Sequence, residues 1–175
     1  MTQSMRDEAP DTHTPIAGWL VLAVVVIVID QVTKVGFDNL LAYGERLGVL
    51  PFFDFTLLYN RGAAFSFLAG AGGWQRWFFT LLGIVAIPLL IWLIRRHRDQ
   101  RLFCAALALI LGGAVGNVID RVLYGHVVDF LLFYWNDWYF PAFNIADAAI
   151  TAGAALMIYD EVWRARKSRP EATSR

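Results

Sequence analysis

The chain has 175 residues, of which 58% are hydrophobic and only 17% charged, and its formal net charge is zero. A soluble domain of this length usually carries more charge. A soluble bundle is the alternative reading, but so small a chain has too little polar surface left to enclose several wholly apolar helices. The composition therefore favours an integral membrane protein.

Residues 1–14 are polar and predict a disordered cytoplasmic extension. Beyond them, uncharged or nearly uncharged stretches are long enough to cross a membrane, which takes about 20 mainly apolar residues. The first predicted helix runs from about Ile16 to Phe37. The other three spans are predicted from the stretches Trp77–Ile94 and Leu102–Ile119, which are uncharged, and Trp138–Tyr159, in which Asp147 is the single charged residue. We therefore predict an all-α integral membrane fold with four transmembrane helices in a domain over residues 15–165.

Two connections are too long to be tight turns. Residues 38–73 contain the aromatic, β-favouring stretch Pro51–Tyr59, which predicts a small extracytoplasmic β element lying against the membrane. Residues 123–141 hold three Tyr and two Trp but no Lys or Arg, which is typical of a segment at the membrane interface. We expect this second connection to lead into the last helix.

Basic residues are distributed unevenly along the chain. They fill the short loop between the second and third helices and the predicted basic tail over residues 166–175. Under the positive-inside rule this loop and this tail are cytoplasmic, and four spans place both termini there. The members of the two groups are Arg95, Arg96, Arg98 and Arg101, then Arg164, Arg166, Lys167, Arg169 and Arg175.

Polar residues that a membrane should disfavour gather at the opposite, outer ends of the helices. Asp147 is 13 residues before Asp160, or roughly 20 Å above the inner boundary at 1.5 Å per residue. Its carboxylate is thus inside the apolar layer but within reach of outside water. Asp129 lies in the outer connection and can fold back over the bundle. The remaining outer polar groups are Asp30 with Lys34, Asn60 with Arg61 and Gly62, Asn117 with Asp120 and Arg121, and Asn144.

Two neighbouring carboxylates in a site of low dielectric constant share a proton, because both cannot ionise easily. Such a pair can hydrolyse a peptide: one acid takes a proton from water while the other hydrogen-bonds the scissile carbonyl. For Asp30 and Lys34 an interfacial ion pair that fixes helix depth is the plainer interpretation. Asp120 and Arg121 suit bracing of helix ends, and His126 suits an exposed loop more than a catalytic base.

The same residues carry a resemblance to a known family. Asp30-Gln-Val-Thr-Lys34, Asn60-Arg-Gly-Ala-Ala-Phe-Ser66, Gly112 to Arg121, Gly125-His-Val-Val-Asp-Phe130 and Phe143-Asn-Ile-Ala-Asp147 appear in order. Over about residues 16–165 the chain resembles signal peptidase II, the lipoprotein signal peptidases of bacteria. The resemblance implies four transmembrane helices with a small periplasmic β-cradle.

The resemblance also implies an activity and a site. It implies an aspartic endopeptidase that cleaves diacylglyceryl-modified prolipoproteins just before the lipidated cysteine, on the periplasmic side of the bacterial inner membrane. It implies no metal, no cofactor and no nucleic-acid partner, and inhibition by globomycin-type peptides. Asp129 and Asp147 would be the catalytic dyad. The expected supporting residues are Asn60, Gly62, Asn117, Asp120, Arg121, Asn144 and Ala146, with Asp30 and Lys34 beside them.

Three rival functions make different demands. A proton-coupled transporter needs polar groups through the whole membrane depth, yet the inner halves of the second and fourth helices are apolar. Zinc and serine peptidase motifs, His-Glu-x-x-His and Gly-x-Ser-x-Gly, are absent from the sequence. A non-catalytic assembly factor that uses the acid region as a binding groove stays open at this stage, and substitution of the two aspartates distinguishes it.

Overall fold

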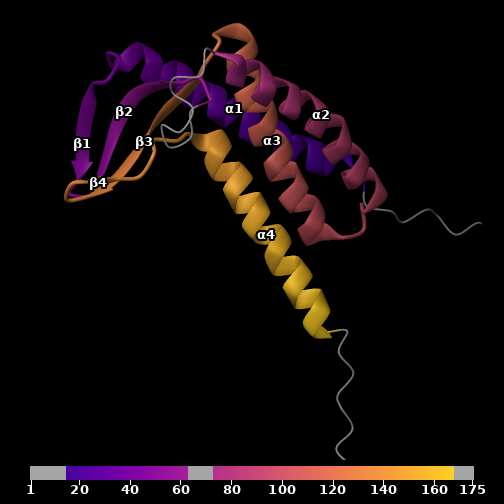
Figure 1. Ribbon diagram of the computed structural model, residues 1–175. Coiled ribbons are helices and arrows are strands. Elements are labelled where there is room, and N and C mark those ends of the chain that lie inside the picture. The colour runs from indigo at the N-terminus through magenta and orange to yellow at the C-terminus, as the bar shows by residue number, and fades with distance from the viewer. Residues whose placement is uncertain (1–14, 63–72, 168–175) are drawn as a thin grey trace, which may run out of the picture.

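The structure is a computed structural model that describes residues 15–62 and 73–167. Within these residues the chain forms four long helices and a four-stranded antiparallel sheet at one end of the helical bundle (Figure 1). The elements follow the order α1 (Ala17–Leu40), β1 (Arg46–Leu50), β2 (Phe53–Asn60), α2 (Trp74–Arg96), α3 (Arg101–Leu123), β3 (Val127–Trp135), β4 (Trp138–Tyr139) and α4 (Ile145–Lys167). The predicted fold class is confirmed. The expected extension 1–14, residues 63–66 of the second motif and the last eight residues lie outside the described ranges.

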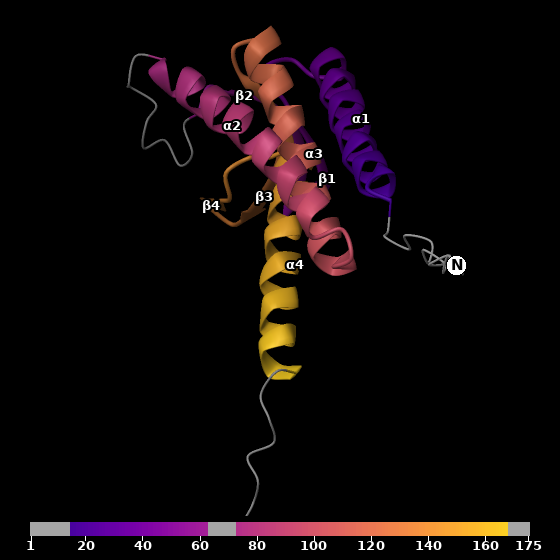
Figure 2. The ribbon, with the colours of Figure 1, turned by 90° about the vertical axis from the view of Figure 1, so that its right-hand side faces the viewer.

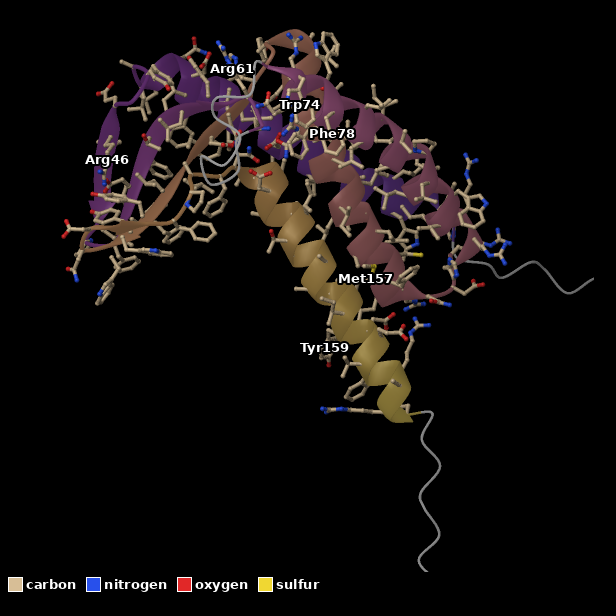
Figure 3. All side chains as sticks on the ribbon, viewed as in Figure 1. Arg46, Arg61, Trp74, Phe78, Met157 and Tyr159 are labelled. Atoms are coloured by element: carbon tan, nitrogen blue, oxygen red, sulfur yellow. The ribbon has the colours of Figure 1, made fainter. Side chains whose placement is uncertain are left out.

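Three of the described helices, α1, α2 and α3, are long and apolar enough to cross a membrane. Their outer surfaces are apolar as well: Trp74 and Phe78 project from α2 with 53% and 50% of their surface exposed (Figure 3). Such surface is unfavourable in water and suits contact with lipid. Helix α4 has 23 residues, but its uncharged stretch, residues 148–159, is shorter than that of the other helices.

The last helix begins several residues inside its apolar stretch. Trp138–Tyr159 is one apolar run, yet residues 138–144 form β4 and an extended connection, and α4 begins only at Ile145. Pro141 has no N–H to donate to a helix, and Phe143 instead pairs with Leu131 of β3. Asn144 then caps the helix, because its Oδ1 accepts the backbone N–H of Asp147 at 3.0 Å. This start agrees with the prediction that residues 123–141 form a connection leading into the last helix.

Helix α3 is the centre of the bundle and contacts α1, α2 and α4. Figure 2 shows it between α1 and α2. Glycines allow this close approach, as the sequence predicts. A methyl group on Gly116 would lie 2.5 Å from the carboxylate of Asp30, and one on Gly113 would collide with the carbonyl oxygen of Ala146. Both neighbours belong to the polar end of the bundle, so the glycines let α1 and α4 meet there.

The sheet has the strand order β1-β2-β3-β4 and is made from two segments far apart in the chain. The prediction of strands around Pro51–Tyr59 is confirmed by β2. The other two strands, β3 and β4, lie within residues 127–139, which the sequence predicts only as an interfacial connection. Leu58 pairs with Asp129, and Asn60 with Val127. This register brings Asn60 and Asp129 to the end of the two central strands that lies nearest the bundle.

Aromatic packing fixes the sheet against α1. Phe130, 1% exposed, stacks on Phe37 with ring centroids 4.4 Å apart, and Phe37 also touches Phe55 at 4.6 Å. Alternation along β3 then turns Asp129 to the face opposite Phe130. The strand therefore holds Asp129 rigidly over the polar end of the bundle.

Candidate active site

The two predicted acids come together from different elements. Asp129 lies in β3 and is 2% exposed, whereas Asp147 lies in the first turn of α4 and is half-buried. Asn144 connects them directly: its Nδ2 donates to Oδ1 of Asp129 at 2.7 Å, and its Oδ1 accepts the N–H of Asp147. Asn144 thus orients one acid and caps the helix that carries the other.

The amide of Asn60 holds the other oxygen of Asp129. Its Nδ2 donates to Oδ2 at 3.0 Å, while its Oδ1 accepts the backbone N–H of Gly62 at 2.8 Å. Gly62 has φ +108°, a conformation that favours glycine, and an added methyl group would lie 2.9 Å from the ring of Phe79. Both predicted residues therefore act together in orienting Asp129.

A third amide holds Asp147. Nδ2 of Asn117 donates to Oδ1 of Asp147 at 2.7 Å, and Oδ1 of Asn117 accepts from Nζ of Lys34 at 3.1 Å. An ammonium group and a backbone N–H can only donate. Lys34 thus fixes the orientation of Asn117, just as the backbone fixes that of Asn60 and Asn144. All three amide NH₂ groups face the carboxylates.

Below Asn117 lies a buried charge cluster formed by Asp30, Lys34 and Asp120. Nζ of Lys34 is 2.8 Å from Asp30 and 3.0 Å from Asp120, and the three residues are 0–2% exposed. The expected Asp30–Lys34 ion pair therefore forms, but it is buried between helices and not interfacial. Helices α3 and α4 pack against this face of α1 and cover the ion pair.

The cluster also ties the helices to one another at the site. Asp30 accepts the backbone N–H of Ala146, which is fully buried, at 2.8 Å. Asp120 accepts the N–H of Val128 at 3.2 Å. One carboxylate therefore holds the start of α4, and the other holds β3 next to Asp129.

Arg121 lies at the outer end of α3, as expected. Its Nη1 donates to the carbonyl of Asn117 at 3.1 Å, and its guanidinium stacks over Phe79 at 5.4 Å. Its Nε is buried and has no hydrogen-bond partner among the described residues. A buried N–H without a partner is costly, so this end of α3 retains an unused donor.

The pKa of Asp129 is raised to about 7, first by burial and then by the negative charge of Asp147, whereas the hydrogen bonds from Asn60 and Asn144 oppose the shift. The effect of the charge of Asp147 on this pKa indicates that the two carboxylates are close enough to interact. A pair of this kind binds one proton near neutral pH.

Two contributors were missed as site residues. Gln31 donates to Asp120 at 2.8 Å and to Asp30 at 3.2 Å, and Phe79 lies beside both Gly62 and Arg121. Gln31 had a usable signal, since it is a polar residue in an apolar helix next to Asp30. Phe79 had none, because an aromatic residue in a membrane helix is common.

A helical membrane bundle that holds two buried, interacting carboxylates at one end, under a small sheet, has the arrangement of a membrane-embedded aspartic peptidase. The description of the matching family agrees. The family model for signal peptidase (SPase) II matches residues 22–163.

Individual relatives extend the match to almost the whole chain. The lipoprotein signal peptidase of Paraburkholderia phytofirmans is 55% identical over 172 residues, which is 97% of this chain and 100% of the relative. That of Cupriavidus necator is 57% identical over 162 residues, or 93% and 92% of the two chains. A solved bacterial membrane enzyme superimposes with a TM-score of 0.79 at 32% identity, covering 93% of this chain and 98% of that one. The chain belongs to the signal peptidase II family.

Proposed function

We propose that Asp129 and Asp147 are the catalytic dyad of this peptidase, whose family removes signal peptides from prolipoproteins. One observation carries the proposal: three asparagine amides, each oriented by a group that can only donate, present their NH₂ groups to the two carboxylates. The amides accept no proton from the acids. The proton that the pair holds is therefore available only to water and substrate.

The geometry supports hydrolysis without a covalent intermediate. With one proton on the pair, the ionised carboxylate takes a proton from the attacking water. The protonated carboxyl donates a hydrogen bond to the scissile carbonyl and stabilises the tetrahedral intermediate as charge develops on its oxygen. The unused Nε of Arg121 is a donor that a substrate carbonyl can accept from at the end of α3. Asn60, Asn117 and Asn144 position the acids.

We further propose that the substrate is a diacylglyceryl-modified prolipoprotein, cut before its lipidated cysteine at the periplasmic surface. The acids lie at the end of the bundle opposite Arg95, Arg96 and Arg101, which the positive-inside rule places in the cytoplasm (Figure 1). Exposed apolar surface surrounds that end: Trp135 and Trp138 of the sheet are 70% and 65% exposed. Acyl chains attached next to the cleavage site would remain in lipid there.

Lipidation of the substrate is expected to raise kcat/KM by about 100-fold or more, because burial of each acyl CH₂ contributes about 0.8 kcal/mol. The measurement compares one prolipoprotein peptide with and without the diacylglyceryl group, in detergent micelles. Globomycin-type peptides are expected to inhibit cleavage of the lipidated form. Equal kcat/KM for the two substrates contradicts the proposed substrate class but leaves the dyad untouched.

The pH profile of cleavage is expected to be bell-shaped, with an alkaline limb near pH 7. The pKa of Asp129 is raised to about 7, so the pair keeps its proton below that pH and loses it above. On the acid side the second carboxyl also takes a proton, and no base remains. Single-turnover rates between pH 4 and 9 test this. A profile that is flat from neutral to mildly alkaline pH, with chemistry limiting, would rule out a shared proton.

A further inference from the structure

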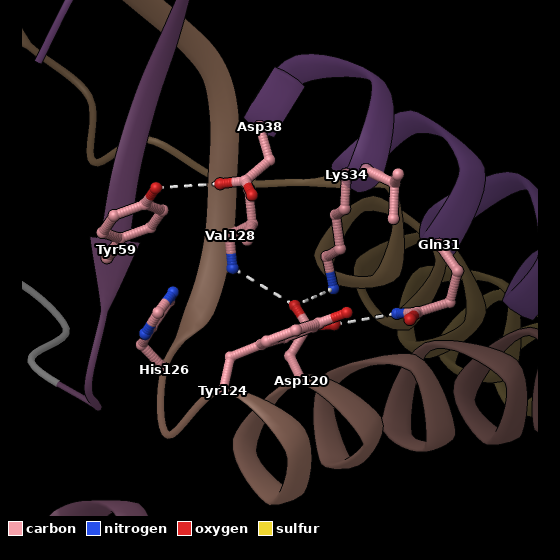
Figure 4. A pocket seen from close by; sticks show the side chains of 9 residues that line it. Gln31, Lys34, Asp38, Tyr59, Asp120, Tyr124, His126 and Val128 are labelled. Atoms are coloured by element: carbon pink, nitrogen blue, oxygen red, sulfur yellow. Dashed lines mark hydrogen bonds and ion pairs between the residues drawn. The ribbon is translucent and has the colours of Figure 1, made fainter. Parts of the chain in front are cut away.

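A pocket of about 150 Å³ lies on the far side of the buried charge cluster and shares Lys34 and Asp120 with it (Figure 4). It is enclosed by α1, the end of β2 and the turn between α3 and β3. Neither Asp129 nor Asp147 lines it. The two proposed acids thus lie outside the pocket. The kind of ligand that it can bind follows from the residues that line it.

One wall of the pocket is formed by Gln31, Lys34, Asp120 and Val128, and the hydrogen-bond donors of these residues are already engaged within the protein. Lys34 is shared by Asp30 and Asp120, so these three groups carry one net negative charge. Gln31 donates from Nε2 to Asp120 at 2.8 Å, and Val128 donates its N–H to the same carboxylate at 3.2 Å (Figure 4). The groups of this wall that a ligand can still bind are therefore acceptors, including the side-chain carbonyl oxygen of Gln31.

The mouth of the pocket is acidic and aromatic. Asp38 accepts the hydroxyl of Tyr59 on Oδ1 at 2.9 Å, and no described donor reaches its Oδ2. The ring of His126 lies 4.2 Å from that of Tyr59 and 6.3 Å from that of Tyr124. Burial lowers the pKa of His126, which leaves this ring uncharged at neutral pH. A carboxylate oxygen and three ring systems therefore surround one small space.

We propose that this pocket binds a primary ammonium group. A carboxylate and aromatic faces both attract a cation, and the acceptors left in the walls require a ligand that brings its own N–H donors. An anion would meet Asp38 and the net negative cluster behind it. A quaternary ammonium has no N–H and is larger, so it satisfies fewer of these acceptors.

Two sources supply this chemistry at the outer surface: the headgroup of phosphatidylethanolamine and a soluble amine. The surroundings favour the lipid. Val35 lines the pocket and is 51% exposed on the face that α1 presents to lipid. Arg61, exposed at the end of β2, places a cation near the rim, where its charge acts on His126. That cation suits the phosphate of the same headgroup.

The test is native mass spectrometry of the purified full chain with phosphatidylethanolamine, phosphatidylcholine or phosphatidylglycerol of matched acyl chains. We expect phosphatidylethanolamine to bind about tenfold more tightly than the other two, which is the effect of one charge-assisted hydrogen bond. Asp38→Asn keeps the bond from Tyr59 but removes the charge, and it should abolish the preference. Tyr124→Ala should weaken binding, whereas Tyr124→Phe, which keeps the ring, should not.

Asp137→Asn is the matched control, since Asp137 is also an exposed acid on the sheet side of the molecule. It should leave the lipid preference intact. Soluble phosphoethanolamine distinguishes the sources: displacement of the lipid at millimolar concentration supports a soluble amine, and no displacement supports the lipid. Equal retention of all three lipids, or the same loss in Asp38→Asn and Asp137→Asn, overturns the proposal. Because binding is measured without substrate and Asp38→Asn should cleave normally in detergent, failure here is independent of the dyad.

Discussion

Replacing either Asp129 or Asp147 by asparagine is expected to lower the cleavage rate by about 10³-fold or more. General acid–base catalysis contributes about 10² to 10⁴ in rate, and each acid of the pair has a role that an amide cannot fill. The double variant should be little worse than either single one, since acids that act as a unit are not additive. Single-turnover cleavage of a lipidated peptide gives these rates.

The controls separate chemistry from folding. Asparagine has the shape of aspartate, and in Asp129→Asn one of the two amides, Asn60 or Asn144, still donates to a carbonyl oxygen while the other loses its acceptor, so thermal unfolding should shift by only a few degrees. Asp137→Asn, in the turn between β3 and β4, should retain the full rate. Processing at the normal rate by both dyad variants would restore the alternative of a non-catalytic binding groove.

Replacing Lys34 by methionine is expected to destabilise the fold by about 3–5 kcal/mol. The change removes the only cation that bonds Asp30 and Asp120 within the described residues and leaves two buried carboxylates without a compensating positive charge. It also removes the ammonium donor to Oδ1 of Asn117, whose Nδ2 bonds Asp147. Thermal unfolding in detergent should show the loss of stability as a fall of roughly 10 °C, accompanied by slower cleavage.

Arg164→Met is a matched control for Lys34→Met. Arg164 also pairs with an aspartate four residues earlier, at 2.9 Å, but its side chain is 41% exposed. Exposed ion pairs contribute about 0–1 kcal/mol, so this variant should unfold almost as the parent does. Adding Asp120→Asn to Lys34→Met removes one of the uncompensated charges and should recover part of the stability. Equal effects of the two single substitutions would show that the buried cluster has no special weight.

The sequence was informative where an ionisable residue lies within an apolar segment. Asp30, Asp120 and Asp147 are ionisable residues in apolar helices, and this conflict alone marks a site at one end of the bundle. Asn117 lies with Asp120 near the outer end of α3, and Asn144 caps the helix that carries Asp147. For Asp129 no such conflict exists, because an acid in a polar connection is ordinary. Its place in the site was inferred from the resemblance of its motif.

The features that could not be predicted from the sequence depend on contacts between segments that are far apart in the chain. Strand β3 is recognisable only once β2 is beside it, since its residues Val127 to Trp135 are as typical of an interfacial segment as of a strand. The start of α4 depends in the same way on the bridge between Leu131 and Phe143. The burial of Lys34 follows from the close approach of three helices, which hydrophobic patterns along one helix do not report.

The bond from Ala146 to Asp30 joins the first membrane helix to the last, and this has a consequence for biosynthesis. Asp30, Asn60, Asn117, Asp129 and Asp147 are synthesised in that order, and the last of them lies in the final helix. A chain that ends before α4 therefore lacks one acid of the proposed dyad. On that proposal, proteolytic competence arises only when α4 packs against α1 and α3.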